Sequence, residues 1–215
     1  MYTDLRHRLR CGLMPFLEWG VLRLNLANRI TIARIFLVPV VTFLLLVRFH
    51  FWTLTINHRT TTGSEMIAAF VFILAASTDG LDGYIARKHQ MITNFGKFLD
   101  PIADKLLISA VLISLVEMQR LSAWVAILII SREFAVTALR LVAAVEGIVI
   151  AASRIAKWKT AVQIVAMVAL MLNNFPFSYV GVPFDTIMVY LMVLFTLWSG
   201  IDYFVKNKSI INVNA

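Results

Sequence analysis

The stretch DGLDGYIARKHQMITNFGKFLDPIADK, residues 79–105, connects two apolar runs and carries an unusual group of acidic residues. The runs on either side of it predict helices over 66–85 and 98–118, each long enough to cross a lipid bilayer. A short polar turn lies between them, so the two helices are expected to run antiparallel. Four of the chain's twelve acidic residues fall in this stretch: Asp79, Asp82, Asp100 and Asp104.

These aspartates form two pairs. With 3.6 residues per turn, Asp79 and Asp82 lie about 60° apart around the first helix, and Asp100 and Asp104 about 40° apart around the second. Each pair shares one helix face, and both faces can point to one place near the inner membrane surface. Each charge at depth costs on the order of 3 kcal/mol, and two carboxylates about 6 Å apart repel by roughly 3 kcal/mol at an effective dielectric of about 20. Either the carboxylates keep their protons or a doubly positive ion lies between them.

A pair of metal ions is the expected occupant of this acidic site. Hard divalent cations prefer oxygen ligands, and two of them about 4 Å apart promote in-line displacement at phosphorus. Two magnesium or manganese ions are therefore expected. An alternative is that Asp100, which precedes Pro101, caps its helix and that Asp79 lies in a loop. That alternative accounts for one or two of the acids and leaves the others unexplained.

Small residues and one cation accompany the aspartates. Gly83, Ala86 and Arg87 follow the first pair, and Gly96 precedes the second. Small side chains let a ligand approach the backbone, and the Arg87 guanidinium offers parallel donors to phosphate oxygens. Small residues at such spacings also serve helix packing, but beside four aspartates they indicate the wall of a pocket.

The composition places the chain in a membrane. Of the 215 residues, 60% are apolar and 15% are charged, and the mean hydropathy is +0.82; soluble proteins average about 45–50% and 25%. Such a content fills about six spans of roughly 20 residues. It excludes a disordered chain, a disulfide scaffold and a nucleic-acid-binding domain, although the net charge is +8. One cysteine and scattered histidines offer no ligand set for zinc or redox chemistry.

The predicted fold class is all-α: a polytopic membrane protein with six transmembrane helices and an N-terminal basic amphipathic segment. The six apolar runs cover 30–48, 66–85, 98–118, 122–146, 156–174 and 184–205. Three of the twenty Lys and Arg residues fall in the predicted external connections: Arg48, Arg59 and Arg120. Because basic residues favour the cytoplasmic side, both termini and the acidic site are expected there, in the plasma (inner) membrane.

Three segments are predicted along the chain. Residues 1–29 carry an excess of arginine among bulky apolar residues, which suits a helix in the headgroup layer; a partly disordered basic tail is the alternative. Residues 30–205 are expected to form one six-helix domain, and 206–215 a cytoplasmic tail. The first apolar run is too long for a signal-peptide core and lacks a cleavage site, so the N-terminus is expected to be retained.

Residues 79–105 resemble the signature of the CDP-alcohol phosphotransferase family, D-x-x-D-G-x-x-A-R, eight residues, G-x-x-x-D-x-x-x-D, at every fixed position. The resemblance implies that the first three aspartates hold two divalent metal ions. It implies that Asp104 is the base on the attacking alcohol and can also touch metal. The implied CDP-lipid site comprises Asp79, Gly83, Ala86, Arg87 and Gly96. The family has a six-helix membrane fold and usually dimerises, which implies a homodimer.

Residues 24–205 resemble, more narrowly, the branch of this family that joins CDP-diacylglycerol to glycerol 3-phosphate and releases CMP. The segments NLANRITIARIFLVPV and SREFAVTALRLVAAVEGIVIAASRIAKWKTAVQ carry the likeness. Ala27 replaces a frequent proline, and Ala156 stands where a glycine is common. Other acceptors with the same chemistry stay open, namely phosphatidylglycerol, inositol phosphate or serine.

Cations within apolar runs predict a second phosphate site. Arg132 and Arg140 lie in one apolar helix, where an ionisable side chain is costly and marks function. With Lys157, and with Arg34 at a helix start, they are expected to bind the phosphate of glycerol 3-phosphate. The alternative is a structural ion pair between Glu133 and one of these cations.

A protein of another class, an ion-coupled transporter, also uses intramembrane aspartates. Transporters are commonly built from repeated halves with broken helices. The chain shows no internal repeat, and this favours the enzyme.

Overall fold

The structure of the protein is a computed structural model. It describes residues 26–47, 49, 52–56, 59–89, 94–145 and 154–206. Within these ranges, side chains are described except at 26–30, 56, 78–89, 94–101, 145 and 154. Most of the predicted basic segment, residues 1–25, and nearly all of the predicted tail, 207–215, lie outside the described residues.

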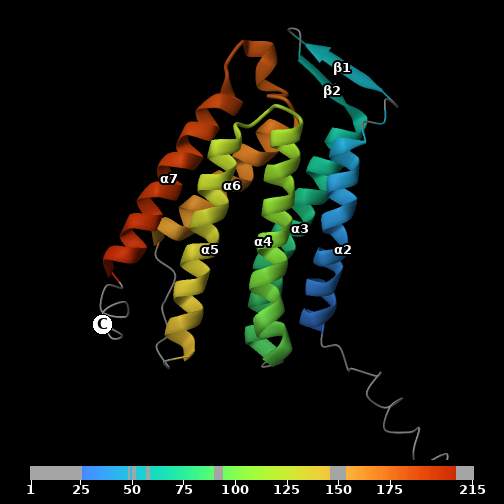
Figure 1. The fold of residues 1–215 in the computed structure, drawn as a ribbon. Coiled ribbons are helices and arrows are strands. Elements are labelled where there is room, and N and C mark those ends of the chain that lie inside the picture. Colours follow the sequence, from blue (N-terminus) through green and yellow to red (C-terminus); the bar gives the residue numbers. More distant parts are fainter. Residues whose placement is uncertain are drawn as a thin grey trace, which may run out of the picture.

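Six long α-helices run side by side through the described residues (Figure 1). They are α2 (Leu26–Leu46), α3 (Gly63–His89), α4 (Asn94–Glu117), α5 (Ala123–Val145), α6 (Arg154–Met171) and α7 (Phe184–Lys206). Each coincides with one predicted apolar run, so the helical class and the places of the six helices are confirmed. A 3-10 helix, η1 (Phe177–Val180), lies in the connection between α6 and α7.

The prediction of an all-α chain is wrong in one connection. Between α2 and α3, strands β1 (Thr53–Ile56) and β2 (Arg59–Thr62) pair antiparallel, with Ile56 opposite Arg59. Their β-branched residues favour extended backbone, and two such runs separated by two residues are a hairpin signal that a search for apolar runs passes over. The hairpin lies at the upper end of the bundle in Figure 1.

Within the described residues, α7 is the one helix that is long and apolar enough to cross a membrane. Shorter apolar segments, Thr31–Leu46 and Gly63–Ser77, lie in α2 and α3. α5 does not meet the criterion because Arg132, Glu133 and Arg140 interrupt its apolar sequence. Six helices are thus present where six spans are predicted, and in the described part of the chain one of them is long and apolar enough to cross a membrane.

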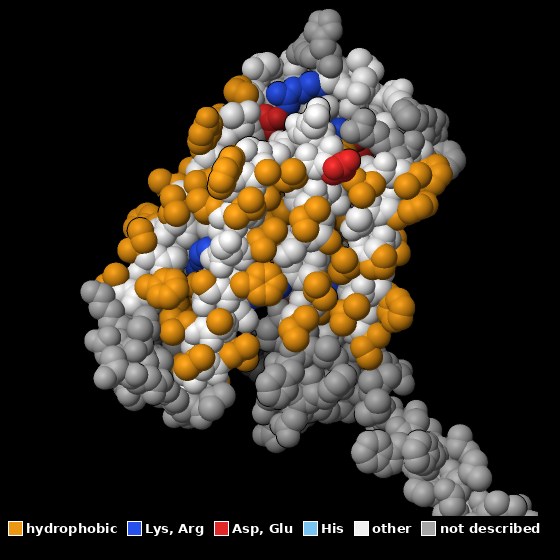
Figure 2. Space-filling model, in the orientation of Figure 1, with side chains coloured by type: hydrophobic (Ala, Val, Ile, Leu, Met, Phe, Trp, Pro, Cys, Tyr) orange, Lys and Arg blue, Asp and Glu red, His pale blue; other side chains and the backbone are white. Residues whose placement is uncertain are grey.

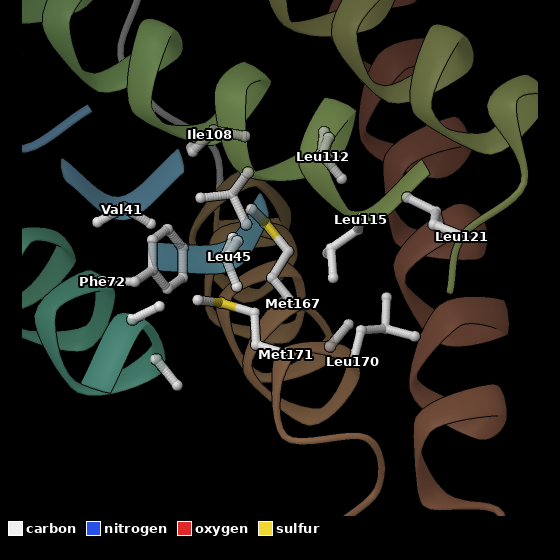
Figure 3. Packing of buried hydrophobic residues seen from close by; sticks show 14 of the residues in the cluster. Val41, Leu45, Phe72, Ile108, Leu112, Leu115, Leu121, Met167, Leu170 and Met171 are labelled. Carbon is white, nitrogen blue, oxygen red and sulfur yellow. The ribbon is translucent and has the colours of Figure 1, made fainter. Parts of the chain in front are cut away.

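The main core lies between α2, α3, α4 and α6. Leu45, Phe72, Leu112 and Met167 are buried there, one from each of these helices (Figure 3). Ala68 is fully buried, and such small residues let helix backbones approach closely. α2 packs against both α3 and α4. This packing fixes the two helices that carry the acidic residues.

Buried polar contacts fasten the helix ends at the upper end of the bundle. The Glu65 carboxylate accepts hydrogen bonds from the Thr62 N–H (3.1 Å) and from Arg120 Nη2 (2.8 Å). Arg120, in the turn between α4 and α5, also donates to the carbonyl oxygens of Leu170 (3.2 Å) and Met171 (2.8 Å). One guanidinium thus joins the start of α3, the α4–α5 turn and the end of α6.

The hairpin is fastened to later parts of the chain as well. Arg59 of β2 forms an ion pair with Asp185 at the start of α7. Thr61 Oγ1 donates a hydrogen bond to the Leu172 carbonyl oxygen (3.0 Å), just after α6. The hairpin is therefore part of the packed structure and not a free loop.

Arg120→Ala is expected to lower the free energy of unfolding by about 3–5 kcal/mol, because it leaves the buried Glu65 carboxylate without its charge partner. The two side chains are 12% and 1% exposed, so solvent screens the pair little. Unfolding of the purified protein in detergent measures the change. Lys206→Ala is the control: its side chain is 62% exposed, and its loss should cost about 0–1 kcal/mol. Equal losses in the two variants would contradict the role given to Arg120.

Candidate active site

The four predicted metal-binding aspartates lie at one end of the bundle. Asp79 and Asp82 are in the second half of α3, and Asp100 and Asp104 are in the first half of α4. α3 runs away from the hairpin and α4 runs back towards it, so both segments lie at the opposite end (Figure 1). The backbone therefore brings the two pairs to the same end, as the spacing predicts.

The aspartates of the acidic site are the expected ligands of the metal ions. The ranges without described side chains include Asp79, Asp82 and Asp100, and also the predicted CDP-lipid residues Gly83, Ala86, Arg87 and Gly96. Among the side chains that are described, no group of three or more His, Cys, Asp and Glu could hold a metal ion. Hard divalent cations bind carboxylate oxygens, so the aspartates of these two consecutive helices suit a site for such ions. Their roles stay predictions.

Asp104, the predicted base, is partly buried on α4. The next residue, Lys105, places its Nζ 3.4 Å from Glu133 Oε2 of α5. The residue after the predicted base thus links α4 to α5.

The carboxylate of Glu133 lies among three cations. Its carboxylate forms ion pairs with Lys105, with Lys159 and with Arg132, whose Nη1 is 3.6 Å from Glu133 Oε1. None of the four side chains is more than 14% exposed. We call this set the Glu133 cluster: Lys105, Arg132, Glu133 and Lys159. It joins α4, α5 and α6 in the interior of the bundle.

The two predicted acceptor arginines of α5 both contact α7. Arg132 Nη2 donates a hydrogen bond to Ser199 Oγ (2.9 Å). Arg140 Nε donates to Tyr203 Oη (2.6 Å), and the Arg140 guanidinium carbon lies 5.2 Å from the centre of the same ring, a cation–π geometry. Arg132 also lines an open apolar groove of about 540 Å³ between α5 and α7, together with Leu128, Ala135, Leu197 and Ile201.

The other predicted acceptor residues lie elsewhere. Arg34 is buried in α2, which packs against α3 and α4. Lys157 is exposed near the start of α6, whereas Lys159 is buried in the Glu133 cluster. Positions two apart in a helix face different sides, so one lysine reaches Glu133 and the other does not. Sequence reasoning gave no role to Lys105, although its place directly after Asp104 was a usable signal.

Known proteins are similar in sequence to this chain over most of its length. The sequence model of the family described as CDP-alcohol phosphatidyltransferase matches residues 24–198. The chain belongs to the CDP-alcohol phosphatidyltransferase family. The matched range extends from just before α2 into α7, and every predicted site residue lies within it.

Curated members of the family are similar over nearly their whole length. A Bacillus subtilis protein named CDP-diacylglycerol–glycerol-3-phosphate 3-phosphatidyltransferase is 49% identical over 183 residues, which are 85% of this chain and 95% of that protein. Proteins of the same name from Rickettsia typhi and Haemophilus influenzae are 36% and 34% identical. They cover 86% and 85% of this chain, and 98% and 92% of their own length.

Proposed function

We propose that the protein transfers the phosphatidyl group of CDP-diacylglycerol to glycerol 3-phosphate, giving phosphatidylglycerophosphate and CMP, a step of phospholipid biosynthesis. The observation that carries the proposal is the 49% identity, over 85% of this chain, with the Bacillus subtilis protein of that name. The Glu133 cluster beside Asp104 supports it, because an acceptor that carries phosphate is held by nearby cations.

The reaction is a displacement at phosphorus. The acceptor hydroxyl attacks the phosphorus that bears the diacylglycerol oxygen, the bond from that phosphorus to the bridging oxygen breaks, and CMP leaves with this oxygen. Asp104 takes the proton of the hydroxyl as general base. Arg132 and Arg140, which lie together on α5, hold the acceptor phosphate. The apolar groove beside Arg132 offers room for an acyl chain of the CDP-lipid.

The remaining signature residues serve the donor substrate. Gly83, Ala86, Arg87 and Gly96 bind the CDP moiety, with Asp79. The proposed metal ligands are Asp79, Asp82, Asp100 and Asp104, for two magnesium or manganese ions. When bound, these ions stabilise the negative charge that accumulates on the phosphate oxygens.

The proposed setting is a lipid bilayer crossed by all six helices. Apolar side chains cover the flanks of the helices (Figure 2), and Phe36, Phe70 and Ile113 are among those that are exposed. Trp124 at the start of α5 and Trp158 near the start of α6 are exposed at opposite ends of the bundle, where aromatic residues favour the membrane interfaces. The charged side chains of the Glu133 cluster, from α4, α5 and α6, then face each other inside the bundle.

The end that carries the aspartates is proposed to face the cytoplasm, together with both termini, in the plasma (inner) membrane. Arg59 and Arg120, two of the three predicted external arginines, are paired with Asp185 and Glu65. Their charges are thus neutralised at the hairpin end. We also propose the segments 1–29 (basic segment), 30–205 (six-helix domain) and 206–215 (tail). The proposed oligomer is a homodimer. Labelling of single cysteines and cross-linking in membranes test the orientation and the dimer.

One assay tests the function: purified protein, CDP-diacylglycerol, magnesium or manganese and a panel of alcohols, with CMP release as the readout. Glycerol 3-phosphate is expected to be the preferred acceptor. Preference for phosphatidylglycerol, inositol phosphate or serine would overturn the acceptor and keep the chemistry. An ion-coupled transporter would release no CMP with any alcohol.

Arg132→Ala and Arg140→Ala are each expected to weaken glycerol 3-phosphate binding by roughly 10 to 150-fold, because each removes a charge-assisted contact with its phosphate. The KM for CDP-diacylglycerol should barely change. The measurement titrates the two substrates separately, on variants that purify as folded protein. A purely structural role would instead reduce the yield of folded protein and affect both substrates alike.

A further inference from the structure

The connection between α6 and α7 exposes apolar side chains at the hairpin end of the bundle. We call residues 173–183 the η1 loop; it contains no charged residue. Tyr179 is 65% exposed and Val180 is 77% exposed, and Phe177 and Val182 are exposed as well. Connections that face water are ordinarily polar. Neighbouring exposed apolar side chains mark a contact with a membrane or with another protein, so this loop needs a partner.

The η1 loop keeps its shape through its own polar groups. The Asn174 side chain donates a hydrogen bond from Nδ2 to the Val182 carbonyl oxygen (2.8 Å), and its Oδ1 accepts the Asp185 N–H (3.2 Å). The carbonyl oxygen of Asn174 accepts the Ser178 N–H (2.9 Å). These contacts close the loop on itself, and the exposed apolar side chains are therefore held in place by the fold.

The backbone of the η1 loop suits surroundings that are poor in water. Seven N–H groups donate to carbonyl oxygens within residues 169–182, namely those of Asn173, Asn174, Phe175, Ser178, Tyr179, Gly181 and Phe184. Pro176 and Pro183 carry no N–H group. Irregular backbone is tolerated in a membrane only where its polar groups have partners. A contact with lipid would thus cost these groups no hydrogen bond.

The apolar surface of the η1 loop continues on α7. This helix begins at Phe184, directly after the loop, and is long and apolar enough to cross a membrane. Its Tyr190, Leu194 and Ile201 are exposed, and their spacing places them on one side of the helix. Figure 2 shows hydrophobic side chains along the flank where α7 lies, up to the hairpin end.

The length of α7 sets the level of the η1 loop in a bilayer. The 23 residues of α7 extend over about 34 Å at about 1.5 Å per residue, slightly more than the roughly 30 Å of the hydrocarbon layer. The loop at its start then lies among the lipid headgroups, where tyrosine is a favoured residue. Asp185, at the same level, is paired with Arg59. The uncharged loop and this paired carboxylate suit a headgroup without net charge.

We propose that the η1 loop is an interfacial anchor, in which Tyr179 and Val180 insert into the headgroup layer at the hairpin end, the outer leaflet in the proposed orientation. The inference rests on the proposed membrane setting. It gives a lipid-binding role to a segment that takes no part in the proposed reaction. The partner is a phospholipid surface without net charge.

A polarity-sensitive fluorophore on Val180→Cys tests the anchor, in the full-length chain with Cys11→Ser, since Cys11 is the one other cysteine. The protein is reconstituted in phosphatidylcholine vesicles with iodide on both sides of the membrane. Quenching by iodide is compared with quenching by lipids that carry a nitroxide near the headgroup. We expect strong quenching by the nitroxide lipid, and iodide quenching several-fold weaker than at an exposed polar position. Tyr179→Cys is the second position, should the first labelled variant not fold.

Thr55→Cys is the matched control. Thr55 is also exposed and lies at the same end, on the polar strand β1, so iodide should quench its probe freely and the nitroxide lipid weakly. Leu194→Cys reports on the membrane itself, because Leu194 is exposed near the middle of α7. Its probe should be quenched by lipids with a nitroxide deep in the acyl chain.

The outcomes separate the anchor from the membrane setting. If no nitroxide lipid quenches the probe at Leu194, the proposed membrane setting fails. If that probe is quenched and the probe at Val180 is as open to iodide as the one at Thr55, the anchor alone fails. Protection of Val180 from both iodide and nitroxide lipid would also overturn the anchor, because a protein, such as a second copy of this chain, would then cover the loop.

Discussion

Asp79→Asn, Asp82→Asn and Asp100→Asn are each expected to reduce CMP release by at least about 100-fold, because each removes a charged ligand from the metal site that stabilises the transition state. An anionic diphosphate cannot bind beside several close carboxylates unless cations lie between them. The parent protein should accordingly be inactive in excess chelator and regain activity when magnesium or manganese is added.

The controls for this prediction use the same preparations. Glu65→Gln keeps the metal site and should keep its metal dependence, whatever its stability. Metal binding measured by calorimetry should be lost in the three aspartate variants and kept in the control. Full turnover in excess chelator, or an active Asp82→Asn variant, would contradict the metal site.

Asp104→Asn is expected to lower kcat by about 100 to 10,000-fold, the usual contribution of a general base. Binding of CDP-diacylglycerol should survive better than in the other aspartate variants, since a base is needed for proton transfer and not for docking. The measurement combines single-turnover CMP release with binding of the CDP-lipid. Losses of lipid binding as large as those of Asp82→Asn would show that Asp104 is mainly a metal ligand.

The sequence predicted the helices well because their apolar runs are long and end at polar turns. All six helices are found, but the hairpin of β1 and β2 was missed, because its threonines are neither apolar nor periodic at helical spacing. Whether each helix crosses a membrane is harder to read from hydropathy. α5 carries Arg132, Glu133 and Arg140, and these charged residues lower its apolar content.

The part of the candidate site that a sequence can predict is the part that spacing along one helix decides. The intervals within the two aspartate pairs set a shared face before any packing is known. The choice between Lys157 and Lys159 was not predictable in this way, because it depends on which side of α6 is turned to α5. Lys105 and Glu133 are 28 residues apart in sequence and lie on different helices. No local sequence pattern therefore predicts their contact.

The hairpin has a consequence for how the chain is completed during synthesis. Thr61 bonds to a carbonyl 111 residues later, and Arg59 pairs with a carboxylate 126 residues later. The strands therefore emerge from the ribosome long before their partners exist, and chains are made at about 5–20 residues per second. Throughout that interval the polar groups of Arg59 and Thr61 lack their final partners. This end of the bundle can be completed only when α7 has been made, so a chain cut short before α7 would leave Arg59 of the hairpin without its partner Asp185.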